Sequence, residues 1–211
     1  MKTTTVKCYL KSFNAMPTSD LITFGNKDFY LLIGEEKKLV NYIEENQSNI
    51  SNYYLEYDHK NSLMPLSDIS KFNARIEPGA IIRDNVEIED DAIILMGAVI
   101  NCGAKIGRKT MIDMNAVVGS GAKIGNNCHI GAGAVIAGIL EPKSNHPVII
   151  EDHVFIGANA VVLEGVHLYE GSVVGAGAVV IKDVLKNQTV VGVPAKVIKE
   201  NTVWELNEEL R

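Results

Sequence analysis

Asp113 and His129 are the side chains whose types and spacing could do chemistry. Asp113 directly follows Ile112, and His129 directly precedes Ile130. If the two isoleucines point inward from neighbouring strands, the alternation of side chains turns both polar groups outward. They would then be diagonal neighbours, with Cβ atoms roughly 7 to 8 Å apart. A carboxylate and an imidazole so placed can flank one substrate, although outward polar residues can also be merely solvated.

The element that must position this pair is a repeat of six residues, running from Ile76 to Val180. An aliphatic residue falls at every sixth position, and this spacing is interrupted once, between Ile136 and Ile150. Its members are Ile76, Ile82, Ile88, Ile94, Ile100, Ile106, Ile112, Val118, Ile124, Ile130 and Ile136, then Ile150, Ile156, Val162, Leu168, Val174 and Val180.

Two further columns keep the same register. Four residues after each aliphatic, the residue is mostly small, and Cys128 occupies this column as a packing residue. Three residues after it comes Gly, Asn or Asp, up to Asp183, with Lys109 and His153 as the departures. These residues accept positive φ readily, so each unit is predicted to be a short strand followed by a tight turn.

A period of six fits neither an amphipathic helix nor a simple alternating strand. It is typical of a parallel β-solenoid, in which each unit buries its inner face by stacking on the next. Three units form one triangular coil, so residues eighteen apart should stack, with Ile76 on Ile94 on Ile112 on Ile130.

Three segments divide the chain. Residues 1–73 lack the repeat and are predicted to form a small α/β cap, with strands over 6–10 and 29–33 and a helix over 35–46. Residues 74–198 form the solenoid. Its interruption at 138–147 adds eight residues and predicts a loop at one corner. Residues 199–211 are predicted to be a short capping helix.

The composition excludes several classes of partner. A net charge of −6 without a Lys/Arg cluster argues against nucleic acid, and no apolar run is long enough to span a bilayer. The cysteines Cys8, Cys102 and Cys128 show no CxxC pattern. We therefore expect free thiols in a reducing cytoplasm.

The repeat resembles that of the hexapeptide-repeat acyltransferases, whose fold is a left-handed parallel β-helix. The resemblance becomes specific to one family over residues 111–166, where ILEP in the loop is followed by PVIIED. This stretch is very similar to the tetrahydrodipicolinate acyltransferases of lysine and diaminopimelate biosynthesis. The segments ARIEPGAIIRD, FYLLIGEE and NSLMPL resemble the N-acetyl branch. Val161 stands where the related succinyltransferases carry a glutamate, so that residue is not carried over.

The resemblance implies transfer of acetyl from acetyl-CoA to the amino group of a ring-opened dicarboxylate, L-2-amino-6-oxoheptanedioate. Such a reaction needs a base for the amine and donors for the thioester oxygen. Asp113 matches a position that contacts the amine-bearing substrate, and either His129 or Glu141 would be the base. Cations for the carboxylates could come from Arg75, Arg83 or Arg108.

The cofactor-binding residues are also expectations of this resemblance. The N–H groups of Gly138 and Gly157 are the expected oxyanion donors, and the pantetheine arm should follow Ala158 and Ala176. Lys196, in the GVPAK segment, is the candidate phosphate contact. A flat solenoid face does not enclose such a ligand, so a homotrimer with sites between subunits is expected.

Three alternatives stay open. One is an acetyltransferase for a sugar or amino sugar with the same repeat, and another is a non-catalytic scaffold. The third is a zinc site built from His129, His146 and His153. These histidines lack the spacing of the paired ligands in β-helical zinc enzymes, so we expect no metal.

Overall fold

The computed structural model describes residues 4–139 and 146–200. They form two compact units that divide between Pro65 and Leu66. Each unit has a hydrophobic core of its own.

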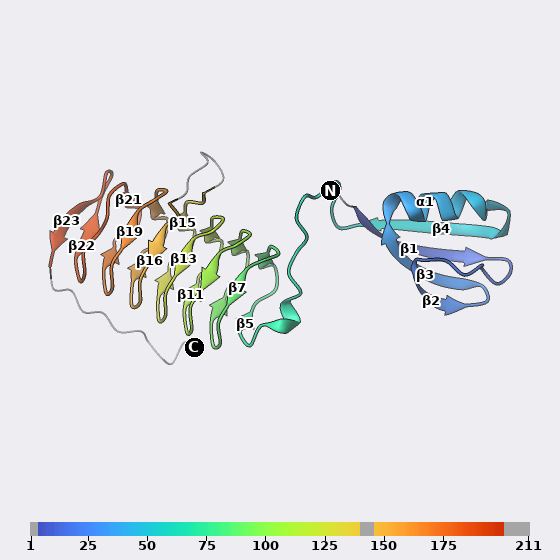
Figure 1. Ribbon diagram of the computed structural model, residues 1–211, viewed down its shortest axis with the longest axis horizontal. Helices are drawn as coiled ribbons and strands as arrows, with labels where there is room; N and C mark the ends of the chain where they lie inside the picture. The colour runs from blue at the N-terminus through green and yellow to red at the C-terminus, as the bar shows by residue number, and fades with distance from the viewer. Residues whose placement is uncertain (1–3, 140–145, 201–211) are drawn as a thin grey trace. The chain divides into compact units, whose positions relative to one another are not determined.

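The first unit is an antiparallel sheet with the strand order β2-β3-β1-β4 (Figure 1). Its elements are β1 Thr5–Ser12, β2 Ile22–Asn26, β3 Phe29–Glu35, α1 Glu36–Glu45, the 3₁₀ turn Gln47–Asn49 and β4 Ile50–Tyr57. Alternating residues of β1 and β3 are buried, among them Cys8, Leu10 and Leu32, and they share a core with Leu39 and Ile43 of α1. The helix therefore covers one face of the sheet.

The predicted strands and helix of this unit are confirmed, with β1 and β3 two residues longer at their C-terminal ends. Within α1, Val40 is only half-buried, whereas Tyr42 is buried and its hydroxyl donates to the carbonyl of Pro17. The strands β2 and β4 were not predicted from the sequence.

The second unit is a parallel β-solenoid with three walls (Figure 1). We name each wall after residues in its strands. The histidine sheet, named for His129, has eight strands, the valine sheet, named for Val117 and Val135, has six, and the lysine sheet, named for Lys105 and Lys123, has five. The histidine sheet contains β5 Arg75–Ile76, β8 Ile93–Ile94, β11 Met111–Ile112, β14 His129–Ile130, β17 Phe155–Ile156, β20 Val173–Val174, β22 Thr189–Val191 and β23 Lys196–Lys199. The valine sheet contains β6 Ile81–Ile82, β9 Val99–Ile100, β12 Val117–Val118, β15 Val135–Ile136, β18 Val161–Val162 and β21 Val179–Val180. The lysine sheet contains β7 Glu87–Ile88, β10 Lys105–Ile106, β13 Lys123–Ile124, β16 Ile149–Ile150 and β19 His167–Leu168. A 3₁₀ turn, Ile69–Lys71, precedes the first coil.

The predicted register of the solenoid is confirmed. Ile112 pairs with Ile94 on one side and with Ile130 on the other. The inserted loop leaves the corner between the valine and lysine sheets without breaking the stacking, because Ile150 still pairs with Ile124. The expected C-terminal helix lies outside the described residues.

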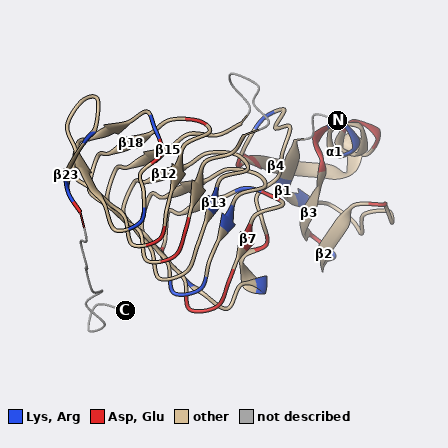
Figure 2. Ribbon diagram, turned by 60° about the vertical axis from the view of Figure 1, so that its left-hand side comes forward, with Lys and Arg blue, Asp and Glu red and all other residues tan. Residues whose placement is uncertain are grey.

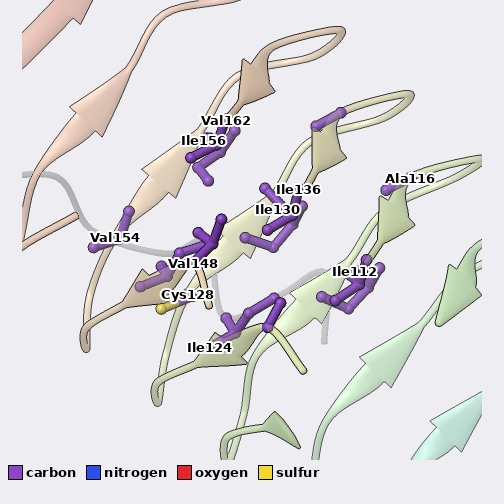
Figure 3. Close-up of a cluster of buried hydrophobic side chains, with 14 of the residues drawn as sticks. Ile112, Ala116, Ile124, Cys128, Ile130, Ile136, Val148, Val154, Ile156 and Val162 are labelled. Carbon is purple, nitrogen blue, oxygen red and sulfur yellow. The ribbon is translucent and has the colours of Figure 1, made fainter. Parts of the chain in front are cut away.

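The core is a column of inward aliphatic side chains on successive coils (Figure 3). Ile112, Ile130 and Ile156 are fully buried. Cys128 is buried in the small-residue column, and its burial raises the pKa of the thiol to about 12. This thiol is a packing group, as predicted from the sequence.

The turn column is confirmed at both unusual positions. Lys109 has a φ of 56° and His153 a φ of 58°, so each adopts the left-handed turn conformation in place of Gly, Asn or Asp. The expectation for the last turn is wrong, because Asp183 does not have a positive φ. Its carboxylate instead accepts a hydrogen bond from the backbone N–H of His167.

Truncation of the core should be costly. We expect Ile130→Ala to lower the free energy of unfolding by about 2 to 5 kcal/mol, because the fully buried side chain leaves a cavity between two coils. Urea denaturation followed by circular dichroism measures this change. Ile149→Ala, at an outward position of the lysine sheet, is the control. Equal losses for the two variants would contradict the assignment of inward and outward columns.

Candidate active site on the histidine sheet

Asp113 and His129 meet on the outer surface of the histidine sheet. Their strands are neighbours, with Met111 opposite His129 and Ile112 opposite Ile130. The Nε2 atom of His129 lies 3.9 Å from Oδ2 of Asp113, which is too long for a hydrogen bond but close enough for a charge contact. The side chains are 20% and 19% exposed. The structure therefore brings the predicted pair together in a partly desolvated position.

The Asp113 carboxylate is also held by its own turn. Its Oδ1 atom accepts a hydrogen bond of 2.7 Å from the backbone N–H of Met114. This bond fixes the side chain at the corner between the histidine and valine sheets and leaves Oδ2 directed to His129. One oxygen thus anchors the group, and the other is available to a ligand.

Phe155 completes the site, and its part in it was not predicted from the sequence. Its ring stacks on the imidazole of His129, with centroids 4.9 Å apart and an interplanar angle of 8°. The two residues are partners in neighbouring strands. Burial is the largest influence on His129 and lowers the pKa of the imidazole, while the charge of Asp113 acts in the opposite direction. The stack therefore favours the neutral imidazole, the form that can accept a proton.

The protonation of His129 gives a testable pH dependence. A lowered pKa means that the neutral base persists at a lower pH than for a free imidazole, so the acid limb of kcat/KM should lie below pH 6.5. Phe155→Leu exposes the ring and should shift both this limb and the NMR titration of His129 upward. Phe155→Tyr, which retains an aromatic stack, should leave both near their wild-type position. A wild-type titration above pH 6.5 would contradict this account.

The backbone supplies a row of open donors beside this pair. At the corner between the histidine and valine sheets, Ala132, Ala158 and Ala176 occupy the same position of successive coils. Among the described residues, their N–H groups have no hydrogen-bond acceptor, and Ala158 and Ala176 are exposed. We call these three residues the alanine corner. Their small side chains leave the donors accessible to an extended ligand.

The corner between the lysine and histidine sheets shows the opposite arrangement. There the N–H of Arg108 donates to Asn126, the N–H of Asn126 donates to Asp152, and the N–H of Glu170 donates to Glu151. Charged segments of both signs lie along the turns of the coils (Figure 2). Because side chains satisfy these donors, the open row at the alanine corner is not a general property of the repeat.

The structure corrects the expected oxyanion donors. The N–H of Gly157 donates to the carbonyl oxygen of Val174 and is not open. A Cβ at Gly157 would lie 2.5 Å from the N atom of Ala176, so glycine is required here for close packing of the coils. Gly138 lies at the corner between the valine and lysine sheets, next to Ser120. Within one chain, the two glycines therefore do not face a common point.

The other predicted residues are spread along the solenoid. Lys196 begins β23 and is exposed, one coil beyond Ala176, after a cis peptide bond between Val193 and Pro194. Arg75 is paired with Glu77, Arg108 is paired with Asp90, and Arg83 donates a long hydrogen bond to Asn101. Glu141 lies outside the described residues.

Neither a metal cluster nor a membrane span is found in the described parts of the chain. Within residues 4–139 and 146–200, no three His, Cys, Asp or Glu side chains are arranged to hold a metal ion. Over the same ranges, no helix is long and apolar enough to cross a membrane.

Three family models match the chain. Residues 1–69 match the N-terminal domain of tetrahydrodipicolinate succinyltransferase, residues 103–138 match the bacterial transferase hexapeptide, and residues 147–182 match the hexapeptide repeat of succinyl-transferase. The fold is therefore the left-handed parallel β-helix of this class.

Curated relatives and solved structures agree with these matches. A 2,3,4,5-tetrahydropyridine-2,6-dicarboxylate N-acetyltransferase from Clostridium perfringens is 56% identical over 94% of this chain and 84% of its own length. The enzyme of the same name from Alkaliphilus metalliredigens is 55% identical over 100% and 92%. The crystal structure of a mutant perosamine N-acetyltransferase from Caulobacter crescentus, with CoA and GDP-perosamine, is 29% identical with a TM-score of 0.56 and covers 61% of this chain and 58% of its own. The chain is thus an acyltransferase that belongs to the family of the tetrahydropyridine-dicarboxylate N-acetyltransferases.

Proposed function

We propose that the chain transfers acetyl from acetyl-CoA to the amino group of tetrahydrodipicolinate that has taken up one water molecule and opened its ring, forming L-2-acetamido-6-oxoheptanedioate and free CoA in diaminopimelate and lysine biosynthesis. The observation that carries this proposal is the 56% identity to enzymes with this activity over most of both chains. The free cysteines Cys8, Cys102 and Cys128 are in keeping with the cytoplasm as the place of the reaction.

Asp113 and His129 are the proposed catalytic pair. Asp113 binds and orients the amino group of the ring-opened substrate through Oδ2, which faces away from the turn that anchors Oδ1. Neutral His129 accepts a proton from that amine as its nitrogen attacks the thioester carbonyl of acetyl-CoA. The carbon–sulfur bond then breaks, and the thiolate of CoA leaves with a proton. Glu141 stays a candidate for the same base.

The alanine corner is the proposed track for the pantetheine arm. This arm carries amide carbonyls that need donors, and the N–H groups of Ala158 and Ala176 are open and one coil apart. Their row runs from the coil of His129 toward Lys196, whose exposed ammonium group could then contact the phosphates. Ala132, in the coil of His129, offers its N–H to the thioester oxygen in place of Gly157.

We expect the active unit to be a homotrimer with sites between subunits. The catalytic pair lies on a wall of the solenoid, so a ligand resting there would stay open to water on its outer side. A neighbouring subunit would enclose it and could supply a cation for the second carboxylate of the substrate. No metal enters this mechanism.

The test is an assay of the purified chain with acetyl-CoA and either tetrahydrodipicolinate or a nucleotide-linked amino sugar. We expect transfer to tetrahydrodipicolinate and a strong preference for acetyl-CoA over succinyl-CoA. The amino-sugar alternative has one observation in its favour, the likeness to perosamine N-acetyltransferase. Transfer to the sugar alone would replace our proposal by this alternative, and failure to bind acetyl-CoA in calorimetry would favour a scaffold.

A further inference from the structure

The row of residues that contains the alanine corner changes at the coil of Asp113. From the N-terminal end of the solenoid, the same repeat position is occupied by Met96, Met114, Ala132, Ala158 and Ala176. The two methionines are exposed, Met96 to 46% and Met114 to 42%. The proposed pantetheine track therefore has small side chains as far as Ala132, and two long side chains stand beyond it.

The open backbone donors also stop at Met114. Its N–H donates to Oδ1 of Asp113 at 2.7 Å. The N–H groups of Ala132 and Ala158, by contrast, have no acceptor within residues 4–139 and 146–200. A carbonyl group of a ligand can thus be bound at Ala132 but not at the next coil. The track has a fixed end between Ala132 and Met114.

The space at this end limits the length of the acyl group. The N–H of Ala132 is the proposed donor to the thioester oxygen, so the acyl chain continues from there toward Met114. Neighbouring coils are about 4.8 Å apart, and carbon atoms in contact need about 3.5 to 4 Å of that distance. Acetyl adds one carbon–carbon bond of about 1.5 Å and fits. Butyryl and succinyl add three such bonds, which together extend about 4 Å, and both would meet the side chain of Met114.

The surroundings of the catalytic pair also disfavour a charged acyl group. Met111 lies opposite His129 in the neighbouring strand, and Phe155 stacks on the imidazole. The outward residues from β8 to β20 of the histidine sheet include no Lys or Arg: Ile93, Met111, His129, Phe155 and Val173. A succinyl carboxylate would lose water beside apolar groups and the negative charge of Asp113, and this part of the wall offers it no cation.

This arrangement bears on the choice of acyl donor. The matching family models include those of succinyltransferases, whereas the curated relatives are N-acetyltransferases. We propose that Met114 is the specificity-determining residue that ends the track, so that the site accepts an uncharged two-carbon acyl group and excludes longer or carboxylated ones. This inference rests on the proposed function, because it takes acyl-CoA as the donor and the alanine corner as its track.

The experiment compares acyl donors in the full chain. The value of kcat/KM with tetrahydrodipicolinate is measured for acetyl-CoA, butyryl-CoA and succinyl-CoA. Met114→Ala should raise the ratio of butyryl-CoA to acetyl-CoA by about 10- to 100-fold, within the range that a mismatch of one methylene produces in an apolar pocket. Met96→Ala, at the same repeat position one coil further, is the matched control and should keep the wild-type ratio. An unchanged ratio in Met114→Ala, or the same change in Met96→Ala, overturns the proposal.

A second variant separates charge from length. Met114→Arg supplies a cation where the succinyl carboxylate would lie. Because a hydrogen bond to a charged group is worth about a factor of 10 or more, this variant should have a ratio of succinyl-CoA to butyryl-CoA about 10-fold above that of Met114→Ala. Equal ratios in the two variants would contradict the exclusion of carboxylated donors.

Binding without an acceptor separates this inference from the proposed function. In calorimetry, butyryl-CoA should bind the wild type about 10-fold more weakly than acetyl-CoA, and Met114→Ala should remove the difference. Met114 is exposed, so the variants should fold, which circular dichroism checks. The expected difference in binding without any acetyl transfer to tetrahydrodipicolinate would count against the proposed function and support the end of the track. Acetyl transfer with equal binding of both donors to the wild type would overturn the role of Met114 and leave the proposed function intact.

Discussion

Asp113→Asn should lower kcat/KM for acetyl transfer by about 10²- to 10⁴-fold, the range lost when a positioned acid or base group is removed. The substitution keeps the side-chain oxygen that accepts the N–H of Met114, so the turn should stay intact. It removes the negative charge 3.9 Å from His129 that we propose to orient the amine and to support the protonated imidazole. Steady-state kinetics with both substrates varied measures the effect, and circular dichroism checks the fold.

The control for this prediction is Glu87→Gln. Glu87 lies on the lysine sheet, away from the histidine sheet, and forms an exposed ion pair with Lys105. Exposed ion pairs of this kind contribute little to the free energy of unfolding, so the activity and stability of the variant should be close to those of the wild type. If Asp113→Asn had the kinetics of Glu87→Gln, Asp113 would have no part in the site.

Ala158→Trp should raise the KM for acetyl-CoA by about 30- to 100-fold, which corresponds to about 2 to 3 kcal/mol of binding energy. Ala158 is exposed and its N–H is open, so the indole would cover the donor and fill the track beside it. The core should not change, because the side chain points outward. Calorimetry with CoA measures binding directly, and kinetics with saturating acetyl-CoA should recover much of kcat.

Glu170→Trp is the matched control for Ala158→Trp. Glu170 occupies the same position of the repeat at the corner between the lysine and histidine sheets, where its backbone N–H already donates to Glu151. A tryptophan there should leave CoA binding unchanged. Similar losses of affinity in both variants would mean that the alanine corner is not the track.

The solenoid could be predicted from the sequence because its rule is local. Each unit needs one inward aliphatic residue, one small residue and one residue that accepts positive φ, and the same rule applies in every coil. The first unit of the chain has no such rule. The strand Ile22–Asn26 is exposed over its whole length, and no residue of the strand Ile50–Tyr57 is fully buried, so neither shows a clear inward pattern.

The candidate site could be predicted only in part. The pairing of Asp113 with His129 could be predicted, because the register of the repeat makes the strands beside them neighbours. Phe155 lies one strand further, but the inserted loop separates it from His129 in the sequence. Its position next to His129 can be predicted only when the eight inserted residues are subtracted from the spacing between the two residues. Whether a backbone N–H is open depends on neighbouring coils, which is why Gly157 was expected as a donor while Ala158 carries the open group.

A crystal structure of the chain with CoA tests the central assignment most directly. We predict that the pantetheine amides will accept hydrogen bonds from the N–H groups of Ala158 and Ala176, with the sulfur beside His129 and Asp113. CoA bound along the lysine sheet, or with its sulfur at a corner remote from His129, would contradict it.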